Sequence, residues 1–98
     1  MRFARNVHFQ LKTGKDAEFN RILTNDVLPL LKKQKGFQQE LTLVNGDRAM
    51  GISVWDDKAN AETYTRDTYP QILQKLQPVI EGSPRVETYE VGATTLTV

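Results

Sequence analysis

The chain of 98 residues contains no cysteine, which excludes disulfides, thiol catalysis, iron–sulfur clusters and zinc sites with thiolate ligands. Its single histidine, His8, also excludes an all-histidine metal site built from one chain. No segment approaches the roughly 18 apolar residues that a membrane-spanning helix needs. The opening segment, MRFARNVHF, lacks the apolar stretch of a signal peptide. We therefore expect a soluble cytoplasmic protein that uses neither a metal ion nor an organic cofactor.

An excess of charge of one sign is also absent. The 13 basic and 12 acidic residues are interspersed and give a formal net charge of +1. Without a basic stripe or an acidic tail, the sequence favours neither a nucleic-acid partner nor a membrane partner. We interpret residues 1–98 as a single domain. A chain of this size buries roughly 65% of its unfolded surface, so a second subunit would add considerable buried area.

Hydrophobic periodicity predicts a strand followed by a helix. Residues 3–12 alternate between apolar and polar side chains, which is typical of a strand with one buried face. Residues 13–36 change to helical spacing, with Thr13 as the predicted N-cap and Gly36 at the end. Pro29 lies inside this segment and predicts a kink or break before it. The apolar stripe comprises Phe19, Ile22, Leu23, Val27, Leu30 and Leu31.

The second half of the chain repeats this pattern. Residues 37–44 and 48–55 predict a hairpin, because the Asn45-Gly46 dipeptide between them favours a tight turn. Asp56 or Asp57 is the expected cap of a second helix, which Pro70 interrupts, and residues 85–91 predict a final strand. The apolar stripe of this helix comprises Ala61, Tyr64, Ile72, Leu73, Leu76 and Ile80.

The element order is therefore βαββαβ, which predicts an α+β fold of the ferredoxin-like type. Right-handed crossovers give an antiparallel four-stranded sheet with strand order 4-1-3-2 and two helices on one face.

Alternation along the strands predicts two different faces for this sheet. The helix-facing side is expected to hold Val7, Phe9, Leu11, Leu41, Leu43, Met50, Ile52, Val54 and Val86. The open side is expected to hold Asn6, His8, Gln10, Thr42, Val44, Gly51, Ser53, Trp55, Glu87, Tyr89 and Val91. Because that open side mixes polar with large apolar residues, we expect a second copy to cover it and to form a dimeric α/β barrel. Residues 93–98 are a candidate arm exchanged between the two copies.

Three segments, VHFQLKTGKDAEF, VLPLLKKQKGF and VWDDKANAETYTRDTYPQILQKL, resemble the dimeric α/β-barrel proteins related to antibiotic-biosynthesis monooxygenases. The likeness covers roughly residues 3 to 92. That family includes cofactor-independent oxygenases acting on aromatic polyketides or quinols, haem-degrading oxygenases and isomerases. The resemblance therefore implies the fold and leaves the chemistry open.

The haem-degrading branch of this family matches the chain poorly. Counted from Trp55, the position of its iron-ligating histidine falls on Gln74, and glutamine is a poor axial ligand for haem iron. Its first-strand asparagine falls on Val7, and Asn6 is expected to point to the other face. At the position of the aromatic residue in the second helix of those enzymes, this chain also has an aromatic residue, Tyr64. We therefore do not expect haem degradation.

The residues offer several candidates for a site, each with a structural alternative. His8 is a candidate base toward an acidic phenol, since the pKa of imidazole lies near neutrality; equally, it is a polar residue hydrogen-bonded across the dimer interface. Trp55 can stack on a planar ligand or serve packing alone. A pocket between the second helix and the sheet, lined by Tyr64, Tyr69 and Arg5, is the preferred ligand site, with core packing as its alternative. Asn6 is a further candidate substrate ligand.

These candidates, together with the resemblance, predict a homodimeric protein that binds a small aromatic or quinone-like molecule. In the catalytic version it is a cofactor-independent monooxygenase of an aromatic or quinol-type substrate, with His8 or a tyrosine as proton acceptor. The alternative is a non-catalytic dimeric barrel that binds a metabolite or has a stress-associated role.

Overall fold

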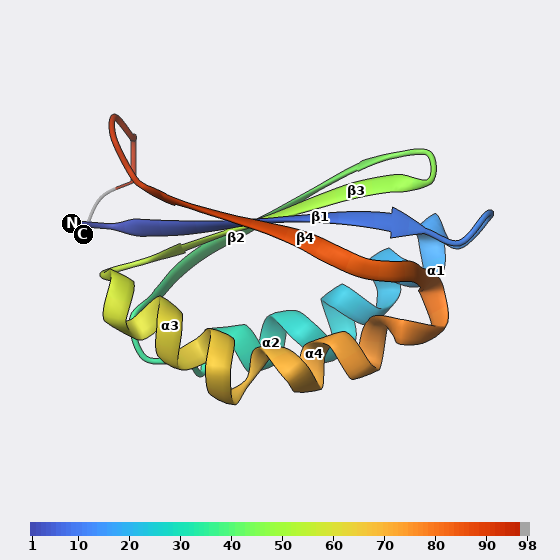
Figure 1. Cartoon of the computed structure of the whole chain (residues 1–98), viewed down its shortest axis with the longest axis horizontal. Helices are drawn as coiled ribbons and strands as arrows, with labels where there is room; N and C mark the ends of the chain where they lie inside the picture. The colour runs from blue at the N-terminus through green and yellow to red at the C-terminus, as the bar shows by residue number, and fades with distance from the viewer. Residues whose placement is uncertain (97–98) are drawn as a thin grey trace.

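The computed structural model of the chain describes residues 1–96 and has the predicted element order (Figure 1). In chain order, the elements are β1 (Phe3–Leu11), α1 (Asp16–Ile22), the π-helical turn η1 (Leu23–Val27), α2 (Leu28–Lys32), β2 (Phe37–Asn45), β3 (Arg48–Trp55), α3 (Lys58–Asp67), α4 (Tyr69–Leu76), the 3₁₀ turn η2 (Gln77–Val79) and β4 (Ile80–Glu90).

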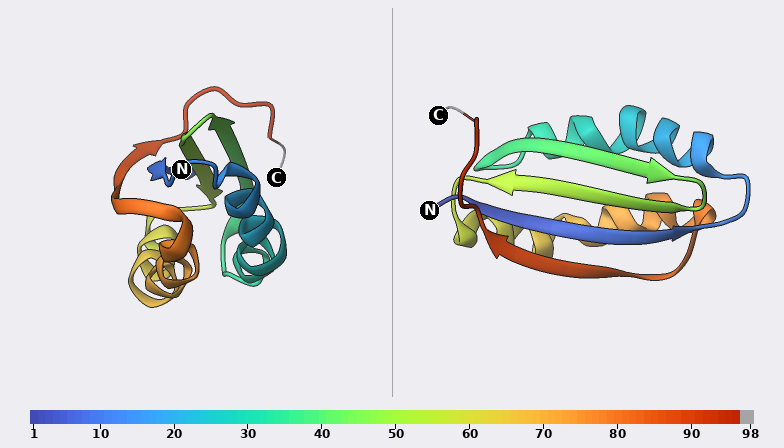
Figure 2. Two further views of the ribbon diagram at one scale, coloured as in Figure 1. Left: turned by 90° about the vertical axis from the view of Figure 1, so that its right-hand side faces the viewer. Right: turned by 90° about the horizontal axis from the view of Figure 1, so that it is seen from above.

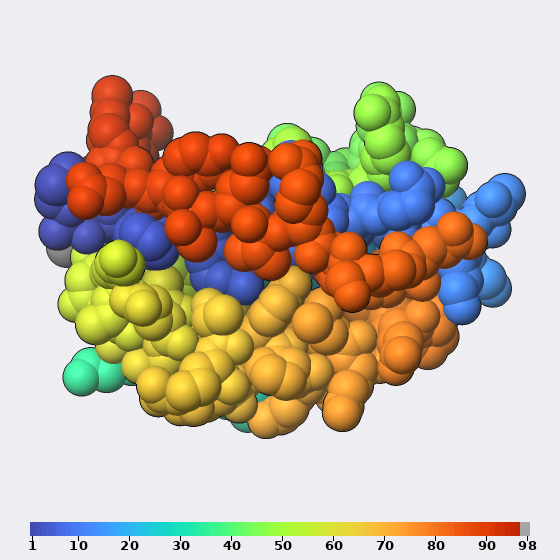
Figure 3. Space-filling view, viewed as in Figure 1, coloured from blue at the N-terminus to red at the C-terminus, as the bar shows by residue number. Residues whose placement is uncertain are grey.

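The four strands form one antiparallel sheet in the order β2-β3-β1-β4. This is the predicted order 4-1-3-2 seen from the other edge, so the ferredoxin-like α+β fold is confirmed. Both helical segments pack on one face of the sheet, and within residues 1–96 no helix covers the opposite face (Figures 1 and 2). Along one edge, β4 lies directly above α3 and α4 (Figure 3). The helix-facing side therefore holds the hydrophobic core.

Both predicted helix interruptions are present, and each adjoins a proline. The first helical segment passes through the π turn η1 before α2, and Pro29 lies in the first turn of α2. Proline is tolerated at this position because the first N–H groups of a helix have no intrahelical acceptor. The second segment breaks at Thr68, whose φ of −119° departs from the regular helical value near −63°, and α4 resumes with Pro70 in its first turn. The interruptions give each helical layer an irregular turn facing the sheet.

Two of the predicted element starts differ from the structure, and one is confirmed. Thr13 does not cap the first helix, which begins at Asp16 without a side-chain cap. The predicted cap at the second helix is confirmed as Asp57, whose carboxylate accepts a hydrogen bond of 2.8 Å from the backbone N–H of Asn60. The last strand begins at Ile80 and not at residue 85, so Ile80 belongs to β4 and not to the helix stripe.

The predicted faces were correct for β1 but inverted for the hairpin of β2 and β3. Trp55 pairs with Phe3 and Ser53 with Arg5, and directly paired residues point to the same side of a sheet. Trp55 is therefore fully buried beneath the helices, whereas Leu41 and Leu43 are 49% and 48% exposed on the open side. Apolar residues occupy both sides of this hairpin, so alternation alone did not determine which side faces the helices.

The inversion changes the composition of both faces. Thr42, Gly51 and Ser53 move beneath the helices, and Met50, Ile52 and Val54 move to the open side with Leu41 and Leu43. On β4, Arg85, Glu87 and Tyr89 pair with residues of β1 that face the open side, as predicted for Glu87 and Tyr89. The open side is consequently more apolar than the sequence predicted.

Residues 91–96 lie at the same end of the molecule as the start of the chain (Figure 1). The backbone N–H of Val91 donates to the carbonyl of Arg2, and the Arg2 side chain donates to the carbonyl of Leu96 at 2.9 Å. The described part of the predicted arm, residues 93–96, thus folds against the start of its own chain, and residues 97–98 lie outside the described residues. Exchange of this arm between copies stays a prediction. Separately, none of the helices within residues 1–96 has the length and apolar character required to span a membrane.

Replacing Gly36 by alanine should destabilise the fold by roughly 3 kcal/mol. Gly36 has a φ of +81°, and an added Cβ would collide with the side chains of Asp56 and Asn60, which hydrogen-bond to each other at 2.8 Å. Gly14→Ala is the matched control, because Gly14 has a φ of +73° but nothing within 4 Å of an added Cβ, so it should lose roughly 1 kcal/mol. Urea unfolding measures both variants, and equal losses would contradict the collision.

Candidate functional site

The candidate site begins with two rows of side chains that cross the helix-facing side of the sheet. Pairing places Arg5 of β1, Ser53 of β3 and Glu40 of β2 in one row, and Val7, Gly51 and Thr42 in the next. Neighbouring strands are about 4.8 Å apart, so β3 lies in the middle of each row. Because β3 contributes only a hydroxymethyl group and a hydrogen atom here, the middle of the floor is hollow.

A cavity of about 30 Å³ lies between this floor and the two helical layers. Leu23 and Val27, at the two ends of the π turn, line it from one layer, and Tyr69, just after the Thr68 break, lines it from the other. Irregular turns of this kind recur at functional sites because they re-aim side chains out of the helical pattern. The remaining lining residues are Arg5, Val7, Phe9, Leu31, Glu40, Thr42, Gly51, Ser53, Tyr64, Ile72 and Leu76.

Arg5 supplies a buried positive charge at this cavity. The residue is only 2% exposed, and its Nε and Nη2 atoms are buried without a hydrogen-bond partner within residues 1–96. Its guanidinium carbon lies 4.3 Å from the ring centroid of Tyr69 and 5.1 Å from that of Tyr64. These contacts provide cation–π attraction, but they leave the two N–H donors unsatisfied. A buried donor without an acceptor is costly, and so indicates a place for a ligand or for water.

An aromatic wall continues from Arg5 toward the end of the sheet. The Trp55 ring lies 4.7 Å from the Tyr64 ring between centroids, and the Tyr64 ring lies 6.2 Å from that of Tyr69. The indole N–H of Trp55 donates to Ser53 Oγ at 2.9 Å, which fixes the orientation of the indole. Burial raises the pKa of both tyrosine hydroxyls, with the Arg5 charge acting in the opposite direction. Both hydroxyls are thus neutral donors at neutral pH.

Glu40 adds a titratable carboxyl opposite Arg5. Burial raises the pKa of Glu40 to about 8, while the nearby backbone N–H groups of Leu41 and Ile52 and the Arg5 charge act against that increase. The carboxyl lies over Gly51, where a Cβ at position 51 would be in ordinary contact with Oε2, at 3.6 Å. Oε2 is itself buried without a partner within the described chain. A carboxyl whose pKa lies near neutrality is suited to accept or donate a proton.

The structure brings four of the sequence-predicted site residues together and separates two from them. Arg5, Tyr64 and Tyr69 line the cavity, and Trp55 packs against Tyr64. Asn6 and His8 point to the open side, so the sheet lies between them and the cavity. The binding roles of all six stay predictions. The sequence analysis did not identify Glu40. A signal was present, because Glu40 and Thr42 alternate with Leu41 and Leu43, which indicates that one face of β2 is polar.

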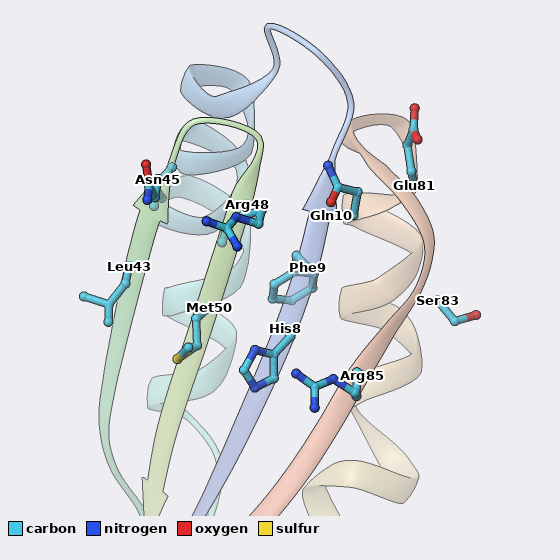
Figure 4. Close-up of a pocket in the computed structure, with 12 residues that line it drawn as sticks. His8, Phe9, Gln10, Leu43, Asn45, Arg48, Met50, Glu81, Ser83 and Arg85 are labelled. Atoms are coloured by element: carbon cyan, nitrogen blue, oxygen red, sulfur yellow. The ribbon is translucent and has the colours of Figure 1, made fainter.

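A second, larger hollow of about 580 Å³ lies on the open side of the sheet (Figure 4). His8, Met50 and Arg85 project into it from β1, β3 and β4. His8 Nε2 lies 3.0 Å from Glu87 Oε1, and both side chains are partly exposed. No three His, Asp or Glu side chains of residues 1–96 are close enough to hold a metal ion, in this hollow or elsewhere.

The chain shares its fold with solved structures that include putative antibiotic biosynthesis monooxygenases. The chain is similar to the NE2512 protein of unknown function from Nitrosomonas europaea, at 21% identity over 99% of this chain and 95% of that chain, with a TM-score of 0.82. It is also similar to SnoaB, a cofactor-independent oxygenase from Streptomyces nogalater, at 14% identity over 96% of each chain and a TM-score of 0.78.

A third similar structure is a monooxygenase from the gene ActVA-Orf6 of Streptomyces coelicolor in complex with nanaomycin D. The identity is 14% over 98% of this chain and 92% of that chain, with a TM-score of 0.78. No family profile and no curated protein sequence matches the chain. At these identities the similarity establishes the fold, and the chemistry has to be argued from the cavity.

The raised pKa of Glu40 gives a testable pH dependence of stability. An acid whose pKa is near 4.5 when unfolded and about 8 when folded stabilises the protein fully below pH 4.5, and this contribution is lost as the pH rises through 8. Between these values the wild type should lose up to about 1.4 kcal/mol of unfolding free energy per pH unit relative to Glu40→Gln, because glutamine does not titrate.

Urea unfolding of both proteins from pH 5 to pH 8 measures this difference. Glu62→Gln, on the exposed side of α3, is the control and should follow the wild type. The groups facing Glu40 across the cavity are Arg5, Tyr64 and Tyr69, which are the same in both proteins, so their contributions cancel. Parallel profiles for wild type and Glu40→Gln would show that this carboxyl is not desolvated.

Proposed function

We propose that this chain is a homodimeric small-molecule-binding protein that acts as a cofactor-independent monooxygenase on an aromatic or quinol-type substrate. The observation that carries the proposal is Arg5, 98% buried beside Tyr64 and Tyr69 with two N–H donors unpaired among the described residues. A ligand oxygen bearing negative charge would satisfy both donors. The flanking rings would hold the planar part of such a ligand.

The reaction needs little from the protein beyond this arrangement. A phenol that loses its proton becomes electron-rich and can transfer an electron to O₂ directly. Recombination places oxygen on a ring carbon; the substrate loses two hydrogen atoms, keeps one oxygen atom, and the other oxygen leaves as water. Arg5 would stabilise the phenolate, and the apolar side chains of η1, α2 and α4 would exclude water from the reduced oxygen.

Substrate entry requires the cavity to open, because about 30 Å³ accommodates water and not an aromatic ring. Tyr69 is the side chain best placed to move. It lies at the first turn of α4, directly after the break at Thr68, and its buried hydroxyl has no partner in the described part of the chain. Rotation of this ring would open the cavity near the break between α3 and α4.

Similar structures support the catalytic version of the proposal. SnoaB is a cofactor-independent oxygenase, and the ActVA-Orf6 monooxygenase was solved in complex with the ligand nanaomycin D. Both match nearly all of this chain. The activity is carried to this chain as a proposal, supported by the cavity residues.

The dimer part of the proposal is supported by the open side of the sheet. Leu41, Leu43 and Tyr89 are each about half exposed there, and Met50 and Ile52 lie between them. Burial of such a patch against a second copy would remove apolar surface from water on both subunits. In that arrangement His8 and Glu87 would lie at the interface, which assigns His8 a structural role.

A non-catalytic barrel is the second candidate function. The small volume of the cavity favours it, since Tyr64 and Tyr69 then act as core residues that shield Arg5. In this version the protein binds a metabolite without transforming it, or only dimerises.

Oxygen uptake with a panel of hydroquinones tests the catalytic proposal. Arg5→Met should reduce uptake by about 100-fold, because the phenolate loses its preorganised positive partner. His8→Ala should leave uptake unchanged, since the sheet separates His8 from the cavity. Arg66→Met, at an arginine whose side chain is 72% exposed, is the control and should also retain uptake. The absence of uptake with every hydroquinone would favour the non-catalytic barrel.

Sedimentation velocity at micromolar concentration tests the dimer. The wild type should sediment as a dimer, and Leu43→Glu should weaken association by about 100-fold, because it places a charge in the apolar centre of the interface. Gln74→Glu adds the same charge on the exposed face of α4 and should leave the dimer intact. A monomeric wild type would remove the dimer from the proposal.

A further inference from the structure

We propose that the cavity recognises a vicinal dihydroxyaromatic, bound as its monoanion through two adjacent oxygens to the Nε and Nη2 of Arg5, with Glu40 as the proton acceptor. This inference rests on the proposed function in one respect, that the cavity beneath α3 and α4 is the ligand site. It adds the substrate class and assigns a proton-transfer residue.

The first argument is the geometry of the unpaired donors. Nη2 is the guanidinium nitrogen on the same side as the Nε hydrogen, so the two N–H bonds run parallel along one edge of the group. Both nitrogens are buried and without a partner in residues 1–96. Such an edge binds two neighbouring acceptor oxygens at once. Oxygens on adjacent ring carbons meet this requirement, whereas the oxygens of a para-hydroquinone lie on opposite ends of the ring.

The second argument is the charge of the cavity. At neutral pH the buried Arg5 is positive, and Glu40, which lies opposite it in the same row, is largely protonated because of its burial. The lining residues within the described chain therefore provide no full negative charge near Arg5. A ligand monoanion neutralises the guanidinium, while a neutral ligand leaves it unpaired and a dianion overcompensates it.

The third argument is the path of the proton. When Glu40 is ionised, one ligand O–H bond can break, its proton bonding to Oε2 of Glu40 and its electron pair staying on the oxygen held by Arg5. Oε2 is buried without a partner among residues 1–96, and Glu40 is one of the residues that line the cavity. The complex then contains protonated Glu40 and a ligand monoanion. Starting from protonated Glu40 and a neutral ligand, one proton is released to solvent overall.

Two chromogenic probes test the inference independently of oxygen chemistry. Absorbance spectra distinguish the neutral from the ionised forms of 4-nitrocatechol and 4-nitrophenol, which differ in the second, adjacent hydroxyl. At pH 6 the wild type should bind 4-nitrocatechol with the spectrum of its monoanion, and at least about tenfold more tightly than 4-nitrophenol. Arg5→Lys keeps the charge but removes the parallel donors, so it should abolish this preference. Arg66→Lys is the matched surface control.

Glu40→Gln provides a separate readout of the proton acceptor. In the wild type, affinity for the 4-nitrocatechol monoanion should fall above pH 8, where ionised Glu40 competes with the ligand for Arg5. In Glu40→Gln this decline should be absent, and Glu62→Gln should behave like the wild type. Circular dichroism and thermal unfolding of each variant confirm that it is folded.

Several results would overturn the inference. A wild type that bound neither probe, or bound both with equal affinity, would contradict it. It would also be contradicted if Arg5→Lys kept the preference for 4-nitrocatechol over 4-nitrophenol, or if the affinity for 4-nitrocatechol had the same pH dependence in the wild type and in Glu40→Gln. Tighter binding of 4-nitrobenzoate than of 4-nitrocatechol would replace the diol by a carboxylate and would overturn it too. Tight binding of 4-nitrocatechol without oxygen uptake on any dihydroxyaromatic, catechols as well as para-hydroquinones, would support this inference and reject the oxygenase activity.

Discussion

Burial of the Arg5 charge is the constraint on which the candidate site depends. Transfer of a guanidinium from water into a protein interior costs several kcal/mol unless hydrogen bonds and opposite charge replace its hydration. Here the rings of Tyr64 and Tyr69 replace part of that hydration, and burial keeps the opposing Glu40 largely protonated at neutral pH. A hydrophobic residue at position 5 would serve packing better. The arrangement is understandable if the charge is held for a ligand that completes it, because functional sites often retain groups that are unfavourable for folding.

The backbone supports this arrangement at three points. Gly51 and Ser53 leave the middle strand without bulk, the π turn after Ile22 shifts the first helical segment, and the break at Thr68 places Tyr69 over Arg5. Each is a departure from the most regular form of its element, and all three adjoin the same cavity. Independent defects would be expected at unrelated positions. Their convergence indicates that the space between sheet and helices is maintained as part of the fold.

Much of the fold was predictable because local signals and topology agreed. The switch from period two to helical spacing, the Asn45-Gly46 turn and the two prolines gave the element order and both helix breaks correctly. The faces of the hairpin were not predictable in the same way, since apolar residues occupy both of its sides and no local feature selects one. Trp55 decides between them through its pairing with Phe3, a contact between segments 52 residues apart that alternation does not contain. The same choice of face placed Thr42 on the open side, so the polar side of this strand was not expected at the cavity and Glu40 was missed.

One choice of face therefore accounts for both surfaces of the sheet. Rotation of the hairpin by one residue would bury Leu41, Leu43 and Met50 and fill the hollow beneath the helices, with Trp55 and Glu40 on the open side. The observed register instead places the polar and small residues of β2 and β3 beneath the helices and their aliphatic residues outside. The same pairing that makes room for a ligand thus creates an apolar sheet face that is unfavourable in water. The proposed ligand binding and the proposed self-association are for this reason linked in the architecture, because a mutation that stabilised the monomer by reversing the hairpin would also remove the cavity.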